Sequence, residues 1–255
     1  MSLSVIKIGT NLLTTPDRAL DVNHLRHLVW QVGQWVKMKG GPVVLVSSGA
    51  ITCGAHALGV VPTTIQDKQA AASVGQVLLM QEYSRWFAQQ GQCVGQILLT
   101  KDGMEHPQAA QNARNTIHCL LQAGVVPIIN ENDSVATTEI GPKFGDNDEL
   151  SAMVAVLLGA NRLVLLSDVD GVYTDNPKSN PLAQRLDRLT CIDDTVWAMV
   201  HDQDNGRSRG GMRSKLMAAS TAMAAGIEVL IANGRTPHVL VEWLQGTVHG
   251  TVIRS

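Results

Sequence analysis

The sequence predicts an α/β fold, a three-layer αβα sandwich around a central, mostly parallel sheet. Short apolar runs without polar alternation, such as 42–46 and 125–129, are typical of strands covered on both faces. Longer segments with apolar residues at helical spacing lie between these runs, so strand and helix alternate along the chain. The 255 residues, 45% of them apolar and 16% charged, are enough to bury a sizeable core.

Each element follows from a residue pattern and a stop signal. The β-branched run 3–8 predicts the first strand, and the apolar spacing from Val22 to Val36 predicts a helix that ends at Gly40. Further strands are expected at 42–46, 94–99, 125–129, 162–166, 228–231 and 247–253. Further helices are expected at 65–90, 107–122, 150–158, 212–225 and 237–244.

The composition argues against several classes of partner. A net charge of −2 produces no global field that would attract nucleic acid or an anionic membrane. The four cysteines are dispersed and form no CxxC pair, which is typical of reduced residues in a cytosolic protein. The first residues show no signal-peptide pattern, and no apolar run approaches the ~18 residues of a membrane span. We therefore expect a cytoplasmic protein that binds neither nucleic acid nor a membrane.

Polar residues gather where the predicted strands end. The clusters are Gly9–Thr10, Ser47–Gly49, Asn130–Asp133 and Ser167–Asp168. Ligands of open parallel sheets bind at the carboxyl ends of strands, so these clusters predict a binding site at one edge of the sheet.

A dense polar stretch, Asp146 to Glu149, directly precedes the apolar helical run that starts at Leu150. One acid there would be an ordinary cap, since Asp and Asn are preferred at helix N-termini and acids are favourable in the first turn. Three acids and an amide after a glycine are more than a cap requires. At this point the sequence leaves capping and a polar site as two open interpretations.

Two lysines have unusual settings. Lys7 interrupts an apolar strand, where its ammonium is costly to bury unless an anion meets it, although a solvated strand face would also explain it. Lys215 follows a glycine-rich turn that opens a helix, an arrangement that presents backbone N–H groups to phosphate. Two lysines on one phosphate would repel each other, and a carboxylate between them, for which Asp148 is the candidate, would keep both charged. This equipment suits phosphoryl transfer, which depends on positioning and positive charge.

Other constellations are weak. The eight histidines show no metal-ligand spacing, and no metal ligands are predicted. Ser48–Gly49 resembles a nucleophile turn, but no GxSxG motif or histidine partner supports a hydrolase.

Five segments along the whole chain resemble the glutamate 5-kinase branch of the amino acid kinase family. They are VLVSSGAITCG (44–54), IINENDSV (128–135), FGDNDELSA (144–152), LLSDVDGVY (165–173) and GGMRSK (210–215). The resemblance implies the amino acid kinase fold, with one domain over 1–255 whose N-terminal part binds glutamate and whose C-terminal part binds ATP. It also implies transfer of the ATP γ-phosphoryl group to the γ-carboxylate of L-glutamate, the first step of proline biosynthesis.

The resemblance assigns roles residue by residue. Lys7 and Lys215 would stabilise the transferring phosphoryl group, and Asp148 would organise them. Glutamate would be held by Ser48, Asn130, Asp133, Asp146 and Asn147, with Asp133 pairing the ammonium. The ATP site would be lined by Ser167, Asp168, Arg209, Gly210, Gly211, Met212, Arg213, Ser214 and Lys215. Mg²⁺ would be held mainly by ATP phosphates and water.

The resemblance further implies a homo-oligomer, dimer or tetramer, with proline as a feedback inhibitor and glutamate-5-semialdehyde dehydrogenase as the recipient of the product. The family often has Thr where this chain has Arg209, and the 141–144 loop looks slightly long, so both put local contacts in question. Longer members continue into a PUA domain, an RNA-binding module, and we expect none here.

Two alternatives stay open. Another amino acid kinase, such as acetylglutamate kinase or aspartokinase, would typically carry a glycine pair after the first-strand lysine, whereas Ile8–Gly9–Thr10 follows Lys7 here. A non-catalytic amino acid sensor on the same fold would be indicated by loss of Lys7, Asp148 or Lys215, and all three are present.

Overall fold

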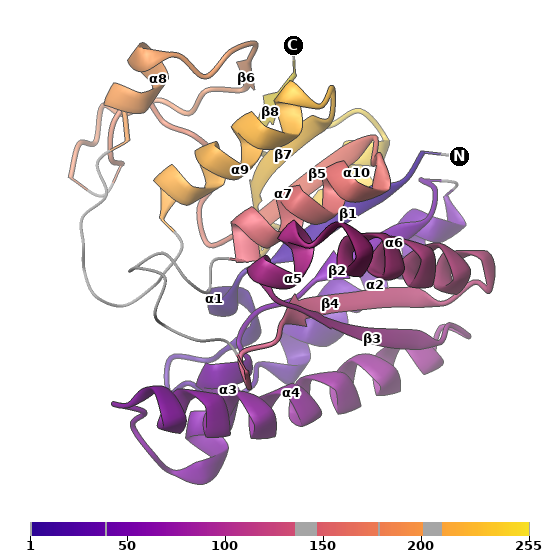
Figure 1. Cartoon of the computed structure of the whole chain (residues 1–255). Helices are drawn as coiled ribbons and strands as arrows, with labels where there is room; N and C mark the ends of the chain where they lie inside the picture. Colours follow the sequence, from indigo (N-terminus) through magenta and orange to yellow (C-terminus); the bar gives the residue numbers. More distant parts are fainter. Residues whose placement is uncertain (1, 39, 136–146, 178, 201–210, 255) are drawn as a thin grey trace.

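The structure is a computed structural model that describes residues 2–38, 40–135, 147–177, 179–200 and 211–254. Strands and helices alternate through this part of the chain, as Figure 1 shows. The strands are β1 (Ser4–Ile8), β2 (Val43–Val46), β3 (Val94–Leu99), β4 (Val126–Glu131), β5 (Arg162–Ser167), β6 (Arg188–Leu189), β7 (Glu228–Asn233) and β8 (Thr251–Ile253). The helices are α1 (Thr10–Leu13), α2 (Val22–Lys37), α3 (Ala50–Leu58), α4 (Ile65–Ala88), α5 (Lys101–Glu105), α6 (Pro107–Gln122), α7 (Asn147–Leu158), α8 (Asp194–Ala198), α9 (Met212–Ala224) and α10 (Val239–Leu244).

All described strands belong to one sheet with the order β3-β4-β2-β1-β5-β7-β8-β6. Neighbours from β3 to β7 are parallel, whereas β8 runs antiparallel to β7. β1 lies inside the sheet between β2 and β5. The predicted αβα sandwich is confirmed, and the carboxyl ends of the parallel strands meet at one edge, where ligands of such sheets bind.

Helices cover both faces of the sheet and create two apolar layers (Figure 1). One layer contains side chains of α6, α7 and α9, and the other contains side chains of α2, α4 and α10. Successive strand residues point to opposite faces, so Val5 joins the first layer while Ile6 and Ile8 join the second. Lys7 therefore shares the face of Val5, the face that α7 covers.

The predicted elements agree with the structure where the hydrophobic pattern is long. The bounds of β3 and α6 match the predicted segments, and α2, α4 and α7 differ by a few residues at most. The short elements α1, α3, α5, α8 and β6 were not predicted, and β8 is shorter than the expected strand at 247–253. Each missed helix has at most nine residues, too few turns for an apolar period to stand out.

Helix α3 has nine residues, several of them small, and it was not predicted from the sequence. It begins after Gly49, whose φ of 90° is in the left-handed region that glycine adopts without strain. Gly54 in α3 and Gly75 in α4 let the two helices cross closely, because a methyl group at Gly54 would overlap the Ala71 carbonyl and one at Gly75 would overlap the Ala50 carbonyl. The crossing places α4 directly behind the Ser47–Gly49 turn.

Candidate active site

Three charged side chains from distant parts of the sequence meet at the carboxyl end of β1. Asp148 Oδ1 lies 2.7 Å from Lys7 Nζ, and Asp148 Oδ2 lies 3.1 Å from Lys215 Nζ. The side chains are 7% (Lys7), 5% (Lys215) and 0% (Asp148) exposed. The sequence left capping and a polar site open for Asp148. The structure places its carboxylate between two lysines, a position that a helix cap does not require.

Local structure explains why these side chains converge. The strand alternation turns Lys7 toward α7, and Asp148 is the second residue of α7. Lys215 lies in the first turn of α9, which packs beside α7 on the same face of the sheet. Each of the three residues is thus held by a regular element rather than by a loop.

The charges at this cluster do not balance. Burial raises the pKa of Asp148, but the charges of Lys7 and Lys215 and their hydrogen bonds outweigh burial and lower this pKa to about 2. The carboxylate is therefore ionised at neutral pH. Two ammonium groups against one carboxylate leave one positive charge among the three side chains, and a buried positive charge favours an anionic ligand.

A second cluster consists of amide and hydroxyl groups around Asn147, the residue that precedes Asp148 in the sequence. Asn147 Nδ2 lies within donating distance of Ser47 O (2.8 Å), Asn130 Oδ1 (2.9 Å) and Ser48 Oγ (3.0 Å). These residues are all at least nine-tenths buried. The structure thus brings together three of the five predicted glutamate-binding residues, Ser48, Asn130 and Asn147.

The other two predicted glutamate contacts are placed less fully. Asp133 follows β4 by two residues and is partly buried. Asp146 lies outside the described residues. The same holds for Arg209 and Gly210 of the predicted ATP site.

The described residues of the predicted ATP site lie at the ends of β5 and α9. Ser167 is the last residue of β5, and the carboxylate of Asp168 accepts a hydrogen bond from Asn11 Nδ2 at 2.9 Å. Ser214 Oγ lies 2.9 Å from Asp148 Oδ2 and 3.0 Å from Gly211 O, so it links the α9 turn to the charged cluster.

Two members of the predicted ATP set face other neighbours in this structure. Met212 packs against the apolar layer that α7 and α9 share. The guanidinium of Arg213 lies over the Trp197 ring, 5.5 Å from its centroid.

Two helix N-termini beside the lysines have features that suit a phosphate chain. Gly211, the N-cap residue of α9, makes no side-chain cap, so within the described residues the first-turn N–H groups of α9 are not capped by this residue, and Gly9 precedes the single turn of α1. A Cβ at Gly9 would lie 3.2 Å from Leu166 O and 3.6 Å from Lys7 Nζ, so the absent side chain leaves room beside this ammonium. Buried lysines and uncapped helix N-termini fit a triphosphate.

Metal ligation has less support from protein side chains. The part of the chain that the structure describes holds no group of three His, Cys, Asp or Glu residues that could bind a metal ion. A divalent cation in this site would therefore take its ligands mainly from phosphate oxygens and water.

Two polar residues of α4 touch the amide cluster and were not predicted as site residues. Gln76 Oε1 accepts from Asn130 Nδ2 at 2.8 Å, and Tyr83 Oη lies 3.1 Å from Ser47 Oγ. A signal was available, because Gln76 stands on the same helical stripe as the buried residues Ala72, Leu79 and Tyr83. A polar residue on a buried stripe needs a hydrogen-bonding partner.

Arg235 was also missed. It follows β7, its Nη2 donates to Asn11 O at 2.9 Å, and its Nη1 lies 3.6 Å from Asp21 Oδ2. It links the segment after β7 to Asn11 of α1, whose side chain donates to Asp168, and no motif in the sequence marked it.

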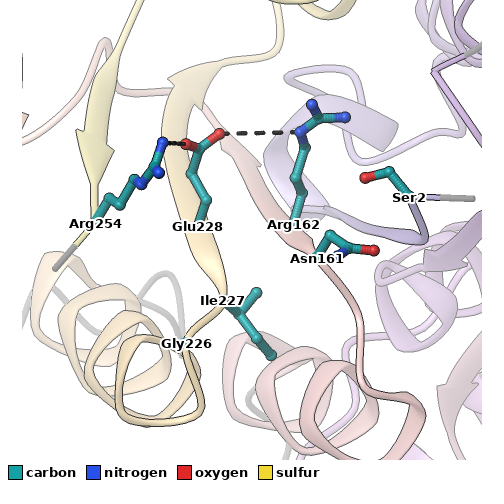
Figure 2. A pocket seen from close by; sticks show the side chains of 7 residues that line it. All are labelled: Ser2, Asn161, Arg162, Gly226, Ile227, Glu228 and Arg254. Carbon is teal, nitrogen blue, oxygen red and sulfur yellow. Dashed lines mark hydrogen bonds and ion pairs between the residues drawn. The ribbon is translucent and has the colours of Figure 1, made fainter.

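A cavity of about 390 Å³ lies at the opposite edge of the sheet, where β5 and β7 begin. Figure 2 shows Glu228 between Arg162 and Arg254 in this cavity. Its carboxylate lies 3.9 Å from Arg162 Nε and 3.4 Å from Arg254 Nη1. Glu228 is therefore the counter-ion of both arginines in this cavity. The cavity contains none of the predicted site residues, and we do not assign it to the reaction.

The fold and the buried lysine–carboxylate cluster define a phosphotransferase of the amino acid kinase type. The amino acid kinase family model matches residues 2–233, and the chain belongs to this family. Within the family, the chain is 44% identical to the glutamate 5-kinase of Escherichia coli strain K12 / DH10B over 253 residues, which cover 98% of this chain and 68% of that protein. The glutamate 5-kinase of Shigella boydii serotype 18 matches with the same identity and coverage.

Solved structures support the fold. An isopentenyl phosphate kinase superposes with a TM-score of 0.70 at 20% identity and covers 98% of this chain and 99% of its own. The UMP kinase from Ureaplasma parvum superposes with a TM-score of 0.68 at 16% identity and covers 100% of this chain and 99% of its own. These identities are too low to transfer a substrate, and they establish the architecture alone.

Proposed function

We propose that this chain transfers the γ-phosphoryl group of ATP to the γ-carboxylate of L-glutamate and forms L-glutamyl 5-phosphate and ADP. The observation that carries the proposal is the buried Lys7–Asp148–Lys215 cluster at the carboxyl end of β1. The identity with glutamate 5-kinases supports the choice of substrate.

The chemistry needs positive charge more than acid–base catalysis. A γ-carboxylate is already ionised at neutral pH, so one of its oxygens attacks the γ-phosphorus without a general base. The bond from this phosphorus to the β,γ-bridging oxygen breaks, and ADP leaves with the electron pair. In this proposal Lys7 and Lys215 would neutralise the charge on the transferring group, and the contacts of Asp148 with both lysines support a role in holding the two ammonium groups in place.

Binding is divided along the chain in this proposal. The N-terminal part supplies Ser48, Asn130 and Asp133, and Asn147 joins them from α7 to hold glutamate. The C-terminal part supplies Ser167, Asp168 and the first turn of α9 for ATP. Bound Mg²⁺ would supply positive charge to the phosphates, and its ligands would be mainly phosphate oxygens and water.

Several finer expectations stay predictions. They are the cytoplasmic location, the homo-oligomer, inhibition by proline, transfer of the product to glutamate-5-semialdehyde dehydrogenase, and the lack of nucleic-acid binding. Among the described residues, no helix is both long and apolar enough to cross a membrane.

One coupled assay tests the proposal by measuring ADP release with L-glutamate, N-acetylglutamate and L-aspartate in parallel. We expect turnover that depends on L-glutamate and Mg²⁺. N-Acetylglutamate should be rejected, because acetylation removes the ammonium that Asp133 would pair, and a site built to bind a charged group rejects an analogue that lacks this group. Equal or faster turnover with N-acetylglutamate would favour an acetylglutamate kinase, and no turnover with any of the three would favour a sensor.

A further inference from the structure

The orientation of the Asn147 carboxamide is determined by its neighbours. Its Nδ2 faces Ser47 O at 2.8 Å, and a backbone carbonyl can only accept a hydrogen bond. The nitrogen must therefore point toward the Ser47 turn and the oxygen away from it. Within the described part of the chain, Asn147 Oδ1 is buried and has no hydrogen-bond partner. A buried acceptor of this kind suits a donor group on a ligand.

Asn130 is oriented by the same logic. Its Oδ1 accepts from the backbone N–H of Glu131 at 2.9 Å, and a backbone N–H can only donate. Asn130 Oδ1 consequently faces Asn147 Nδ2, and Asn130 Nδ2 faces Gln76 Oε1 at 2.8 Å. Gln76 thus provides the acceptor that the buried Asn130 amide nitrogen requires.

Tyr83 supports the other side of Asn147 through Ser47. The Ser47 hydroxyl donates to Ser48 O at 3.3 Å, which makes the Tyr83 hydroxyl the donor across the 3.1 Å contact with Ser47 Oγ. Burial raises the pKa of Tyr83, so its hydroxyl keeps its proton. Tyr83 therefore holds the Ser47–Ser48 turn by a hydrogen bond. This turn presents Ser47 O and Ser48 Oγ to Asn147.

Both supports come from one rigid element. Gln76 and Tyr83 are seven residues apart on α4, which places them on one face of the helix two turns apart. The helix starts with a capping box between Thr64 and Asp67 and crosses α3 at Gly54 and Gly75. Neither Gln76 nor Tyr83 is among the residues predicted from the sequence to bind glutamate or ATP.

We propose that Gln76 and Tyr83 are positioning residues that set the orientation of Asn147. Through Asn130 and Ser47 they hold the carboxamide nitrogen inward and leave Oδ1 as an acceptor for a hydrogen-bond donor of the amino acid substrate. The inference rests on the proposed function, since it concerns how the same site holds glutamate.

The test compares Gln76→Met and Tyr83→Phe, which remove one acceptor and one hydroxyl with little change of shape. Each should raise the KM for L-glutamate roughly tenfold, because a lost buried partner loosens Asn147. The KM for ATP and kcat should stay within about twofold, as for an interaction used in ground-state binding.

A matched control separates positioning from general stability. Gln90 donates a side-chain hydrogen bond to Val29 O at 2.9 Å, just beyond the other end of α4. Gln90→Met should lower Tm by an amount similar to Gln76→Met and leave the KM for L-glutamate unchanged.

The outcomes distinguish the inference from the function on which it rests. If wild type turns over L-glutamate while Gln76→Met and Tyr83→Phe keep its KM and lose only Tm, the positioning role is refuted and the function stands. If wild type shows no glutamate-dependent turnover, the function fails and the inference fails with it.

Discussion

At the scale of single residues, Asp148 is the residue that links the two lysines of the site. It is buried between two lysines, and its acidity follows from their charges. Its position at the start of α7 would also suit a cap, so the two interpretations differ in what a neutral substitute should do.

The first prediction concerns Asp148→Asn. Asn caps a helix about as well as Asp, so a capping role predicts little change. An organising role predicts at least ~10²-fold loss of kcat, the usual cost of removing one preorganised electrostatic partner. The buried lysines would also lose their counter-ion, at about 3–5 kcal/mol of unfolding free energy. Steady-state kinetics beside thermal melting measure both effects.

The matching control is the double change with Lys7→Ala. Residues that act as a unit are not additive, so Asp148→Asn with Lys7→Ala should cost less than the product of the single losses. Near-wild-type kcat for Asp148→Asn would return the residue to the capping interpretation.

The second prediction concerns acid. The pKa of Asp148 is lowered from 3.8 to about 2 in the folded protein. A group with a depressed folded pKa contributes stability that is complete above its unfolded pKa and lost as pH falls through the folded one. The difference in unfolding free energy between wild type and Asp148→Asn should therefore be constant from pH 7 to about 4 and shrink toward pH 2. Urea titrations at several pH values measure it, and a difference that grows with acid would contradict the lowered pKa.

At the scale of elements, the α3–α4 crossing positions the Ser47–Gly49 turn. The close approach depends on glycines, because a side chain at Gly54 or Gly75 would meet backbone rather than a movable side chain. Backbone cannot give way as a side-chain tip can, so the two helices would have to separate.

The third prediction therefore concerns Gly75→Ala. Alanine favours a helix intrinsically by about 1 kcal/mol, yet the overlap with the Ala50 carbonyl should outweigh this gain and destabilise the protein by about 1–3 kcal/mol. The shift should also raise the KM for L-glutamate, since Ala50 directly follows the Ser48–Gly49 turn. Val77→Ala, on the exposed side of α4, is the control and should change neither quantity. Wild-type Tm in Gly75→Ala would show that the crossing can relax.

At the scale of the whole molecule, the sheet order makes the site possible. Residues 7, 148 and 215 are far apart in sequence, and they meet because β1 lies inside the sheet and α7 and α9 pack on the same face. The site should therefore form as part of the folded domain and need no metal for folding.

The fourth prediction separates the requirements of folding from those of Mg²⁺ and nucleotide binding. Removing Mg²⁺ with EDTA should abolish turnover, because the cation arrives with ATP, and it should leave the Tm of the protein alone unchanged. Mg²⁺ with a non-hydrolysable ATP analogue should raise Tm by mass action, because at a hundredfold excess over Kd the ligand adds about 2.7 kcal/mol to the free energy of unfolding. A fall in Tm on chelation without nucleotide would reveal a structural metal.

The sequence by itself determined the class of fold, because apolar runs and helical periods are local and each long element carries its own. It also determined which residues are candidates for the site. An ionisable side chain such as Lys7 in an apolar strand, or an acidic run at the start of a helix, can be recognised from the sequence alone. Shorter helices such as α3 carried too few residues for a period, and their existence was decided by packing.

Only the tertiary structure decided which of the candidate site residues contact one another. The distances that join Asp148 to both lysines depend on strand order, which no local pattern contains. The role inferred for Gln76 and Tyr83 has the same origin, because a polar residue on a helix acquires meaning only from the partner that packing brings to it. Hydrogen bonds act over about 3 Å, so their partners are chosen by the fold as a whole.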